Sequence, residues 1–217
     1  WSQKLISYAE EQVDHMSKLT YEDLLAACSP GGSSTMVSRT ELVPAAGTLA
    51  SIAPAKFAVG KGRDTKGVYA YEPRFIDGEL RETVLIDSKQ SCLNRVEAEI
   101  RRATEDGEEP VSLVPHIAVR YKGESGEDVI YTDLQLPHRV FDAHIRAGAV
   151  DGLPVTRHER YKAARDASPA DASALLELCP GALIFGSWDA TRKAHQGRWR
   201  SALVGEIIGV LPEGHTT

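Results

Sequence analysis

One short segment concentrates the hydroxyl, amide and cationic side chains that suit the binding of an anion. It follows the apolar residues 84–86 and contains Ser88, Lys89, Gln90, Ser91, Asn94 and Arg95. A strand that runs into a polar helix start presents free backbone N–H groups and the positive end of the helix dipole to a phosphate. The hydroxyl, amide and guanidinium groups would add side-chain hydrogen bonds. The alternative is a well-capped helix with a solvated polar face.

Two later segments carry further candidate contacts. His138 and Arg139 follow Pro137 after a predicted strand. They either donate hydrogen bonds to phosphate and ribose at a sheet edge or serve as a helix cap and an exposed cation. Residues 183–200 combine aromatic and basic side chains, namely Trp188, Arg192, Arg198, Trp199 and Arg200. Such interleaving is typical of proteins that bind single-stranded nucleic acid, although either tryptophan could instead belong to the core.

The glycine-rich stretch 60–67 looks superficially like a nucleotide-binding loop. It lacks the closing Gly-Lys-Ser/Thr sequence, and it precedes a predicted strand rather than a helix. The better functional interpretation is a flexible basic loop in which Lys56 and Lys61 touch a polyanion. A disordered surface loop is the alternative.

The charge of the chain is unevenly distributed. The 217 residues carry a net charge of −6, which argues against a nucleic-acid binder as a whole. Residues 56–66, however, hold four cations against Asp64 alone, and residues 192–200 hold four cations and no acid. Residues 97–109 are strongly acidic, and we expect them to face solvent or the basic loop of another copy. Local potential decides where a polyanion docks.

The sequence gives no positive sign of catalysis. It contains no His-Glu-x-x-His zinc motif, no Gly-x-Ser-x-Gly elbow and no Ser-x-x-Lys pair. Asp87, Asp142 and Asp189 could be catalytic only if the fold brings them together. We therefore expect no catalytic residue, no metal and no cofactor.

Cysteine usage and hydropathy bear on the compartment. The three cysteines are far apart, which fits thiols in a reducing cytosol. No signal peptide is visible, and no run approaches the roughly 18 apolar residues that span a bilayer. We expect a cytoplasmic protein without a membrane partner.

Periodicity and turn signals predict strands and helices in alternation. Asp77-Gly78 between two apolar runs predicts a tight hairpin. Residues 201–211 fit a helix or a strand. The expected helices are 3–16, 21–28, 88–104, 138–147, 157–166 and 170–178; the expected strands are 35–43, 68–76, 80–86, 116–122, 128–134 and 182–188; the expected loops are 45–66 and 189–200.

This order predicts an α+β fold with an antiparallel or mixed sheet and helices largely on one face. The succession of strand, helix, two strands, helix and strand resembles an RRM-type or ferredoxin-like core, here called the palm. We expect residues 1–217 to form one such domain, with inserted thumb or loop elements.

Four ordered blocks also resemble one protein family. Residues 84–97 resemble the "LLDSxQSxANRxE" segment of the backbone subunit of type I-G (formerly I-U) CRISPR surveillance complexes. Residues 136–145 are similar to its "APHRxxDAxxR" segment, and 168–180 to "SPxxAxALxELCPTAL". Residues 183–192 and 200–209 are similar to "LLFGxWDSTR…RALVSEIVG". The resemblance covers about residues 36 to 210.

The resemblance implies a non-catalytic, RRM-like subunit whose copies line up along one CRISPR RNA and present the guide to target DNA. The implied partners are the CRISPR RNA, target DNA through guide pairing, further copies of the chain and other Cascade subunits. Phosphate pairing would fall to Lys89, Arg95, Arg139 and Arg192. Gln90, Ser91, Asn94 and His138 would reach phosphate or 2′-OH groups.

The family also has a thumb, an extended hairpin or loop that kinks the guide, and here 45–66 and 189–200 are its candidates. The chain departs from the family in a shortened stretch at 193–197 and in ending soon after Ile208, where relatives continue. The resemblance thus suggests a C-terminally incomplete chain. An RNA-cleaving subunit that uses a loop aspartate and a protein-only scaffold stay open as alternatives.

Overall fold

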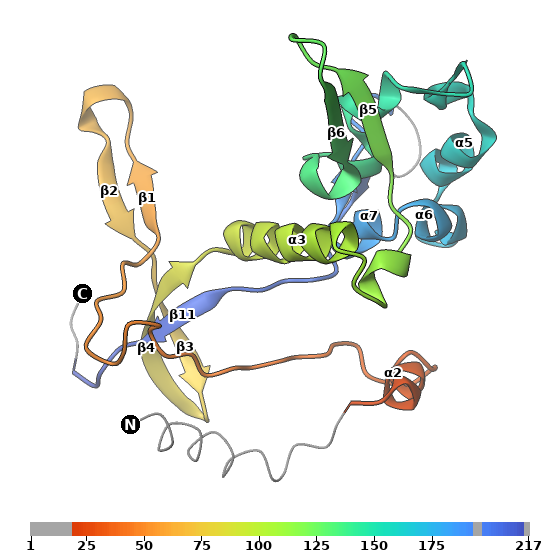
Figure 1. The fold of residues 1–217 in the computed structure, drawn as a ribbon. Coiled ribbons are helices and arrows are strands. Elements are labelled where there is room, and N and C mark those ends of the chain that lie inside the picture. The colour runs from red at the N-terminus through yellow and green to blue at the C-terminus, as the bar shows by residue number, and fades with distance from the viewer. Residues whose placement is uncertain (1–18, 193–196, 215–217) are drawn as a thin grey trace. The chain divides into compact units, whose positions relative to one another are not determined.

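The computed structural model describes residues 19–192 and 197–214, and Figure 1 shows the order of its elements. The chain divides into two compact units, residues 1–51 and 52–217. All the sheets found among the described residues lie in the second unit, as do all the candidate site residues. The second unit is therefore the part that positions a site.

The described helices are α2 (Tyr21–Ala27), α3 (Lys89–Glu105), α4 (Ala143–Arg146), α5 (Glu159–Asp166), α6 (Ser173–Leu178) and α7 (Gly181–Ile184). Single 3-10 turns are η1 (Gly62–Asp64), η2 (Val111–Leu113), η3 (Asp133–Gln135), η4 (Arg139–Phe141) and η5 (Val155–Arg157). The strands are β1 (Lys56–Val59), β2 (Lys66–Tyr69), β3 (Tyr71–Ile76), β4 (Glu79–Asp87), β5 (Ala118–Lys122), β6 (Asp128–Thr132), β7 (Ala149–Val150), β8 (Leu153–Pro154), β9 (Ser187–Trp188), β10 (Arg198–Trp199) and β11 (Ile207–Val210).

In the first unit, the described residues form one helix followed by irregular chain. The Thr20 hydroxyl accepts the Asp23 N–H at 3.2 Å while the Asp23 carboxylate accepts the Thr20 N–H at 2.9 Å, so the helix predicted over 21–28 is confirmed. The strand predicted over 35–43 is wrong, because no strand forms there in the described part of the chain. Strand-type composition yields no ladder without a partner strand. The predicted helix 3–16 lies outside the described residues.

The segment predicted as a long loop over 45–66 instead ends in a β-hairpin. β1 and β2 pair antiparallel, with Lys56 opposite Tyr69. Gly60 and Gly62 have φ angles of 117° and 59°, which glycine adopts without steric cost, so they allow the chain to reverse. Only the part before β1 is irregular.

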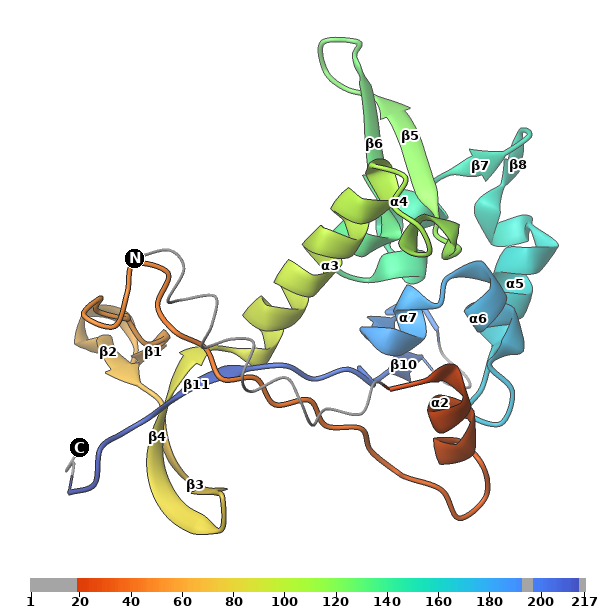
Figure 2. The ribbon, with the colours of Figure 1, turned by 60° about the horizontal axis from the view of Figure 1, so that its bottom comes forward.

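A three-stranded antiparallel sheet in the order β11-β4-β3 follows (Figure 1, Figure 2). The predicted Asp77-Gly78 turn is confirmed, with both residues at positive φ and Ile76 paired with Glu79 across a two-residue loop. The single strand predicted over 68–76 is divided, because β2 pairs with β1 whereas β3 pairs with β4. Residues 201–211, expected as helix or strand, contain strand β11 at Ile207–Val210, and residues 201–206 have no regular secondary structure.

A charged contact ties the two edge strands of this sheet together. The Arg74 guanidinium on β3 binds the carboxylate of Glu206, which directly precedes β11. Arg74 also pairs at 2.8 Å with the exposed Glu72. The hydrogen bond from Arg74 lowers the pKa of Glu206 below its ordinary value, although partial burial opposes this. The contact therefore joins the segment just before β11 to β3.

α3 confirms the helix predicted over 88–104 to within one residue. Its predicted apolar stripe of Leu93, Val96 and Ile100 is only half-buried. Glu97 is buried instead, at 6% exposure. A buried carboxylate on this helix must have a charged or hydrogen-bonding partner.

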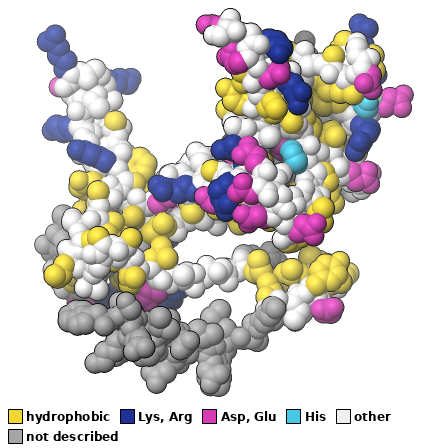
Figure 3. Space-filling model, in the orientation of Figure 1, with side chains coloured by type: hydrophobic (Ala, Val, Ile, Leu, Met, Phe, Trp, Pro, Cys, Tyr) yellow, Lys and Arg dark blue, Asp and Glu magenta, His cyan; other side chains and the backbone are white. Residues whose placement is uncertain are grey.

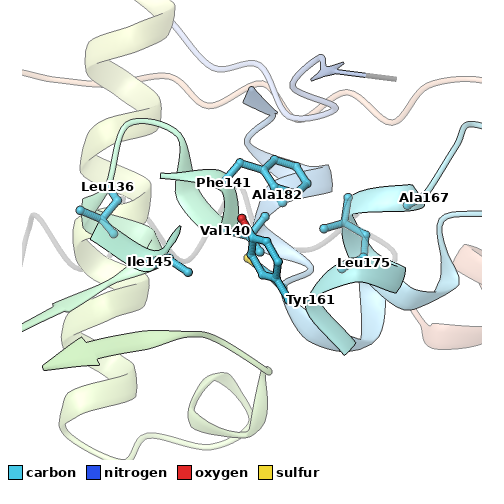
Figure 4. Close-up of a cluster of buried hydrophobic side chains, with 10 residues drawn as sticks. Leu136, Val140, Phe141, Ile145, Tyr161, Ala167, Leu175 and Ala182 are labelled. Atoms are coloured by element: carbon cyan, nitrogen blue, oxygen red, sulfur yellow. The ribbon is translucent and has the colours of Figure 1, made fainter. Parts of the chain in front are cut away.

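The main hydrophobic core lies where the β5–β6 hairpin meets the helices after it. It is built from Leu136, Val140, Phe141, Ile145, Tyr161, Ala164, Ala167, Leu175, Cys179 and Ala182 (Figure 4). The hairpin predicted from 116–122 and 128–134 is confirmed, and Val119 and Tyr131 pack against this core. The chain after β6 is therefore fixed in place by burial.

Three predicted elements near this core differ from the structure. The helix predicted over 138–147 is divided into η4 and α4, because the Asp142 side chain caps α4 by accepting the His144 N–H at 3.0 Å. The strand predicted over 182–188 begins as helix α7, and only Ser187–Trp188 is strand. The helices predicted over 157–166 and 170–178 start later than expected, as α5 and α6.

The predicted α+β class is confirmed, since helices combine with antiparallel sheets. The described strands form one three-stranded sheet and four two-stranded sheets. β5 and β6 pair with each other and with no strand of the β11-β4-β3 sheet. Among the described residues, every helix is too short or too polar to cross a membrane.

The Arg74–Glu206 pair generates a stability prediction. Because the folded pKa of Glu206 is depressed, the pair should stabilise the fold above the carboxyl's unfolded pKa of about 4.3 and lose this effect as pH falls through the folded pKa. Glu206→Gln should lower the free energy of unfolding at pH 7 by about 1 kcal/mol. The difference from wild type should shrink below about pH 4. Urea denaturation followed by circular dichroism measures both.

The matched control is Glu72→Gln, since Glu72 binds the same guanidinium but its side chain is 64% exposed. It should cost less than Glu206→Gln. A pH-independent difference between wild type and Glu206→Gln would contradict the prediction.

Candidate nucleic-acid interface

The start of α3 has the geometry expected of a capped helix. Ser88 is the N-cap, and its hydroxyl accepts the Ser91 N–H at 3.3 Å. Lys89 and Gln90, on the first turn, are exposed. Both line a groove of about 350 Å³ over the β11-β4-β3 sheet, here called the strand groove. The predicted donors of residues 88–91 therefore lie together, and Ser88 also caps the helix.

Asn94 and Arg95 lie one turn further along α3, and both are exposed. The Arg95 side chain is 75% exposed, and its Nε lies 3.3 Å from the Asp87 carboxylate at the end of β4. Asn94 lines a second groove of about 610 Å³, here called the helix groove, between α3 and residues 134–139. The predicted segment 88–95 thus contributes residues to two separate grooves rather than to one.

The Arg139 side chain is only 13% exposed, contrary to the expectation of an exposed cation. Its Nη2 and Nε lie 2.7 and 2.9 Å from Glu97 Oε1, and its Nη1 donates to the Gly186 carbonyl at 2.5 Å. Its guanidinium also stacks over the Phe185 ring at 5.5 Å. These contacts hold an arginine at a φ of 48°, a region that non-glycine residues seldom adopt.

Glu97 gains its charged partner from this arrangement. Burial raises the pKa of Glu97, and the Arg139 guanidinium opposes that rise. The side chains of Glu97 and Arg139 are 7% and 13% exposed. The predicted phosphate ligand Arg139 therefore neutralises a buried carboxylate on the floor of the helix groove.

His138 and Trp188 come together although they are far apart in sequence. Their rings meet edge-to-face with centroids 5.5 Å apart. Trp188 is 51% exposed, so it is not a core residue, whereas Trp199 is only partly exposed and packs against the core. His138 occupies the N-cap position of η4, as one alternative predicted, but its side chain makes no capping hydrogen bond there.

The stretch 189–200, predicted as a loop, contains β10, and its residues 193–196 lie outside the described part. β10 pairs antiparallel with β9, so Arg198 lies opposite Trp188, and Arg198 and Arg200 are exposed. Arg192 is different, because its side chain is only 6% exposed and contacts Asp166 at 3.5 Å. Of the three arginines, two are therefore exposed: Arg198 lies opposite Trp188 in the ladder, and Arg200 directly follows β10.

The β1–β2 hairpin carries the clearest positive surface. Lys56 and Lys61 are exposed, and so are Arg63 and Lys66, which sequence reasoning noticed as charge but did not place in the site. Within the described residues, none of the four forms an ion pair. Figure 3 shows dark blue side chains on this hairpin, whereas α3 mixes dark blue with magenta. Residues 56–69 thus present four cations against Asp64 alone.

The cations of α3 are neutralised by comparison. Arg102 lies 3.0, 2.9 and 3.0 Å from Glu99, Asp106 and Glu108. Arg101, which lines the helix groove and was missed from the sequence, pairs with Glu105 at 2.8 Å. Such i,i+4 pairs can be found from the sequence, whereas their place in a groove cannot.

The three aspartates considered as catalytic candidates lie in separate structural contacts. Asp87 pairs with Arg95, and Asp142 caps α4 while it accepts His144 Nδ1–H at 2.8 Å. Asp189 binds the Arg165 side chain at 2.6 Å. No group of three or more His, Cys, Asp or Glu side chains within the described ranges is placed to hold a metal ion.

Comparison with known proteins identifies one family. The family model described as CRISPR-associated protein GSU0053 matches residues 36–212, which is more than half of the chain and includes every candidate site residue. No curated protein and no solved structure matches the chain.

The geometry separates two arginines that the sequence treats alike. Arg139→Ala leaves Glu97 buried and unpaired, so it should lower the free energy of unfolding by about 3–5 kcal/mol. The double variant Glu97→Leu/Arg139→Met should recover most of that stability, since it removes both charges. Urea denaturation measures both effects.

Arg95→Ala is the control, because the Arg95 side chain is largely exposed. It should lower the free energy of unfolding by much less than Arg139→Ala, because solvent screens the contact of Arg95 with Asp87, whose side chain is 12% exposed. If Arg139→Ala were as mild as Arg95→Ala, the buried pair would not have the structural role assigned to it.

Proposed function

The chain belongs to the family of CRISPR-associated protein GSU0053, and from this premise we propose that it binds CRISPR RNA through the sugar–phosphate backbone. In this proposal it is the repeated, non-catalytic backbone subunit of a type I-G effector complex. Further copies and other Cascade subunits complete the complex, and the held guide pairs with target DNA. Binding that ignores base identity suits a subunit that must accept any guide.

The observation that carries the proposal is the basic β1–β2 hairpin. An exposed cation that forms no ion pair can pair with a phosphate and release the counterions condensed on the nucleic acid. A cation already paired with a carboxylate gains less, because it exchanges one anion for another. The cations of the hairpin form no ion pair within the described residues; they are Lys56, Lys61, Arg63 and Lys66. On α3, by contrast, Arg101 and Arg102 are already paired with carboxylates.

The hairpin also suits the role of the thumb. A two-stranded hairpin is marginally stable alone in water. Residues of β1 and β2 are exposed throughout, including Phe57, Val59 and Val68. An element of this kind gains stability when it packs against RNA or a neighbouring copy. The hairpin also overlaps residues 45–66, one of the two candidate thumb segments.

The exposed donors of α3 would add contacts that do not depend on the base. Lys89, Gln90 and Arg95 are exposed, and Asn94 and Gln135 line the helix groove. Amide and guanidinium groups bind phosphate oxygens and 2′-OH groups alike. Arg139 would support this surface from below rather than bind RNA itself.

RNA binding is tested with Lys61→Ala/Arg63→Ala. Affinity for two RNA guides of unrelated sequence should fall by similar factors. The slope of log affinity against log salt should become shallower by about 0.7 for each phosphate that the variant no longer neutralises. Fluorescence anisotropy over a salt series, in the full chain, measures both.

The matched control is Arg160→Ala/Lys162→Ala, which removes two exposed cations from α5. It should change affinity and slope little. A decrease confined to one guide, or equal decreases in the two double variants, would contradict backbone binding by the hairpin. Metal-dependent shortening of the RNA in the same samples would replace the proposal with a cleaving subunit, and a chain that ignores RNA would point to a protein-only scaffold.

Charge complementarity supports assembly into a homo-oligomer. The C-terminal half of α3 and the residues that follow it are acidic, and Glu105 and Glu108 remain about half-exposed even though each touches an arginine. An acidic surface on one copy suits the basic hairpin of the next. Assembly along RNA would then be partly electrostatic.

Charge reversal tests this contact. Glu105→Lys/Glu108→Lys should shorten the assemblies formed with RNA, as measured by light scattering, because like charges would then meet. Glu124→Lys/Glu127→Lys, on the exposed β5–β6 turn, is the matched control and should leave particle size unchanged. Equal particle sizes for all three proteins would remove the electrostatic contact.

A further inference from the structure

Trp188 is an exposed aromatic residue held between two buried neighbours. Ser187 and Asp189 are 6% and 2% exposed, whereas Trp188 is 51% exposed. Side chains alternate between the two faces of a strand, so burial of the neighbours turns the indole outward. The ring is therefore presented at the surface by a backbone that is fixed on both sides.

The buried neighbour Asp189 is anchored by several hydrogen bonds. Its carboxylate accepts Arg165 Nε–H at 2.6 Å, and it accepts the hydroxyl and backbone N–H of Thr191 at 2.6 and 2.9 Å. Burial alone would raise the pKa of Asp189, but these hydrogen bonds and the Arg165 charge hold it below its ordinary value. Such a network restricts the backbone next to Trp188, so binding has little further ordering entropy to overcome.

The surroundings of the indole suit a nucleic acid. The edge-to-face contact with His138 orients the ring, and Arg198 lies opposite Trp188 in the β9–β10 ladder. His138 stands between Pro137 and Arg139, which both line the helix groove. A nucleic-acid strand bound in the helix groove and continuing past His138 would therefore contact the Trp188 indole.

We propose that Trp188, oriented by His138, stacks against one unpaired nucleobase. The inference rests on the proposed RNA binding and deepens it, because it adds a contact to a base where the rest of the surface contacts phosphate and ribose. Every base has a π face, so the contact is tolerant of sequence. Stacking requires a base that is unpaired and can unstack from the adjacent bases. The surface should therefore bind single-stranded nucleic acid more tightly than duplex.

Abasic RNA separates stacking from backbone contact. The probes are an unstructured ribo-oligonucleotide of mixed sequence and a counterpart of equal length that has ribose and phosphate but no bases. Trp188→Ala should weaken binding of the first by roughly 5-fold to 150-fold and leave binding of the second unchanged. Trp188→Phe should keep most of the affinity, because it keeps an aromatic face.

Leu176→Ala is the matched control, since Leu176 on α6 is a large apolar residue of similar exposure, 54%. It should change binding of neither probe. Circular dichroism of each variant reports on folding. If Trp188→Ala is unfolded, the test relies on Trp188→Phe, which should bind the probe with bases more tightly than the abasic probe.

Each other outcome overturns the proposal. Equal weakening on both probes would mean that Trp188 acts through phosphate or through the fold, while RNA binding itself would stand. A Trp188→Ala effect seen only on self-association by light scattering would assign the residue to a protein interface. A wild-type chain that binds neither probe would overturn this inference and the proposed function together.

Discussion

The ion pair between Glu97 and Arg139 is the interaction on which the candidate interface depends. It joins α3 to the segment after η3, and the same guanidinium reaches the Gly186 carbonyl and the Phe185 ring. One side chain thereby links three parts of the chain that are far apart in sequence. Because burial of a charge is costly unless it is paired, neither partner can move without the other. The walls of the helix groove and the position of His138 follow from this constraint.

Much of the fold is predictable where the signal is local. Asp77-Gly78 forms its hairpin because both residues tolerate positive φ, and Ser88 begins α3 because its hydroxyl satisfies a free N–H. The strand expected over 35–43 fails because a strand also needs a partner, which composition does not supply. Residues 182–188 begin as a helix because an apolar run this short has no periodicity to distinguish the two states.

The site shows the same division between local and distant information. The sequence gives Arg139 and Arg192 the same weight as Lys56 and Lys61, since all four are cations in polar stretches. Their partners decide the outcome: Arg139 meets Glu97, which is 42 positions away, and Arg192 meets Asp166, 26 positions away. Such pairs between residues far apart in sequence cannot be predicted from a sequence pattern. The contact of His138 with Trp188 belongs to the same class, since only the folded chain brings these rings together.

An acidic protein can still bind a polyanion when its charges are sorted in this way. Opposite charges about 3 Å apart, such as those around Arg102, produce an electrostatic potential that falls off quickly with distance. The potentials of several unpaired cations add together instead. Salt limits the reach of either field to roughly 8 Å at physiological ionic strength. A phosphate close to Lys61 therefore responds to the hairpin and not to the net charge of the chain. In the proposed function such contact would not depend on sequence, because phosphates repeat along any guide and the hairpin would offer them charge without shape selection.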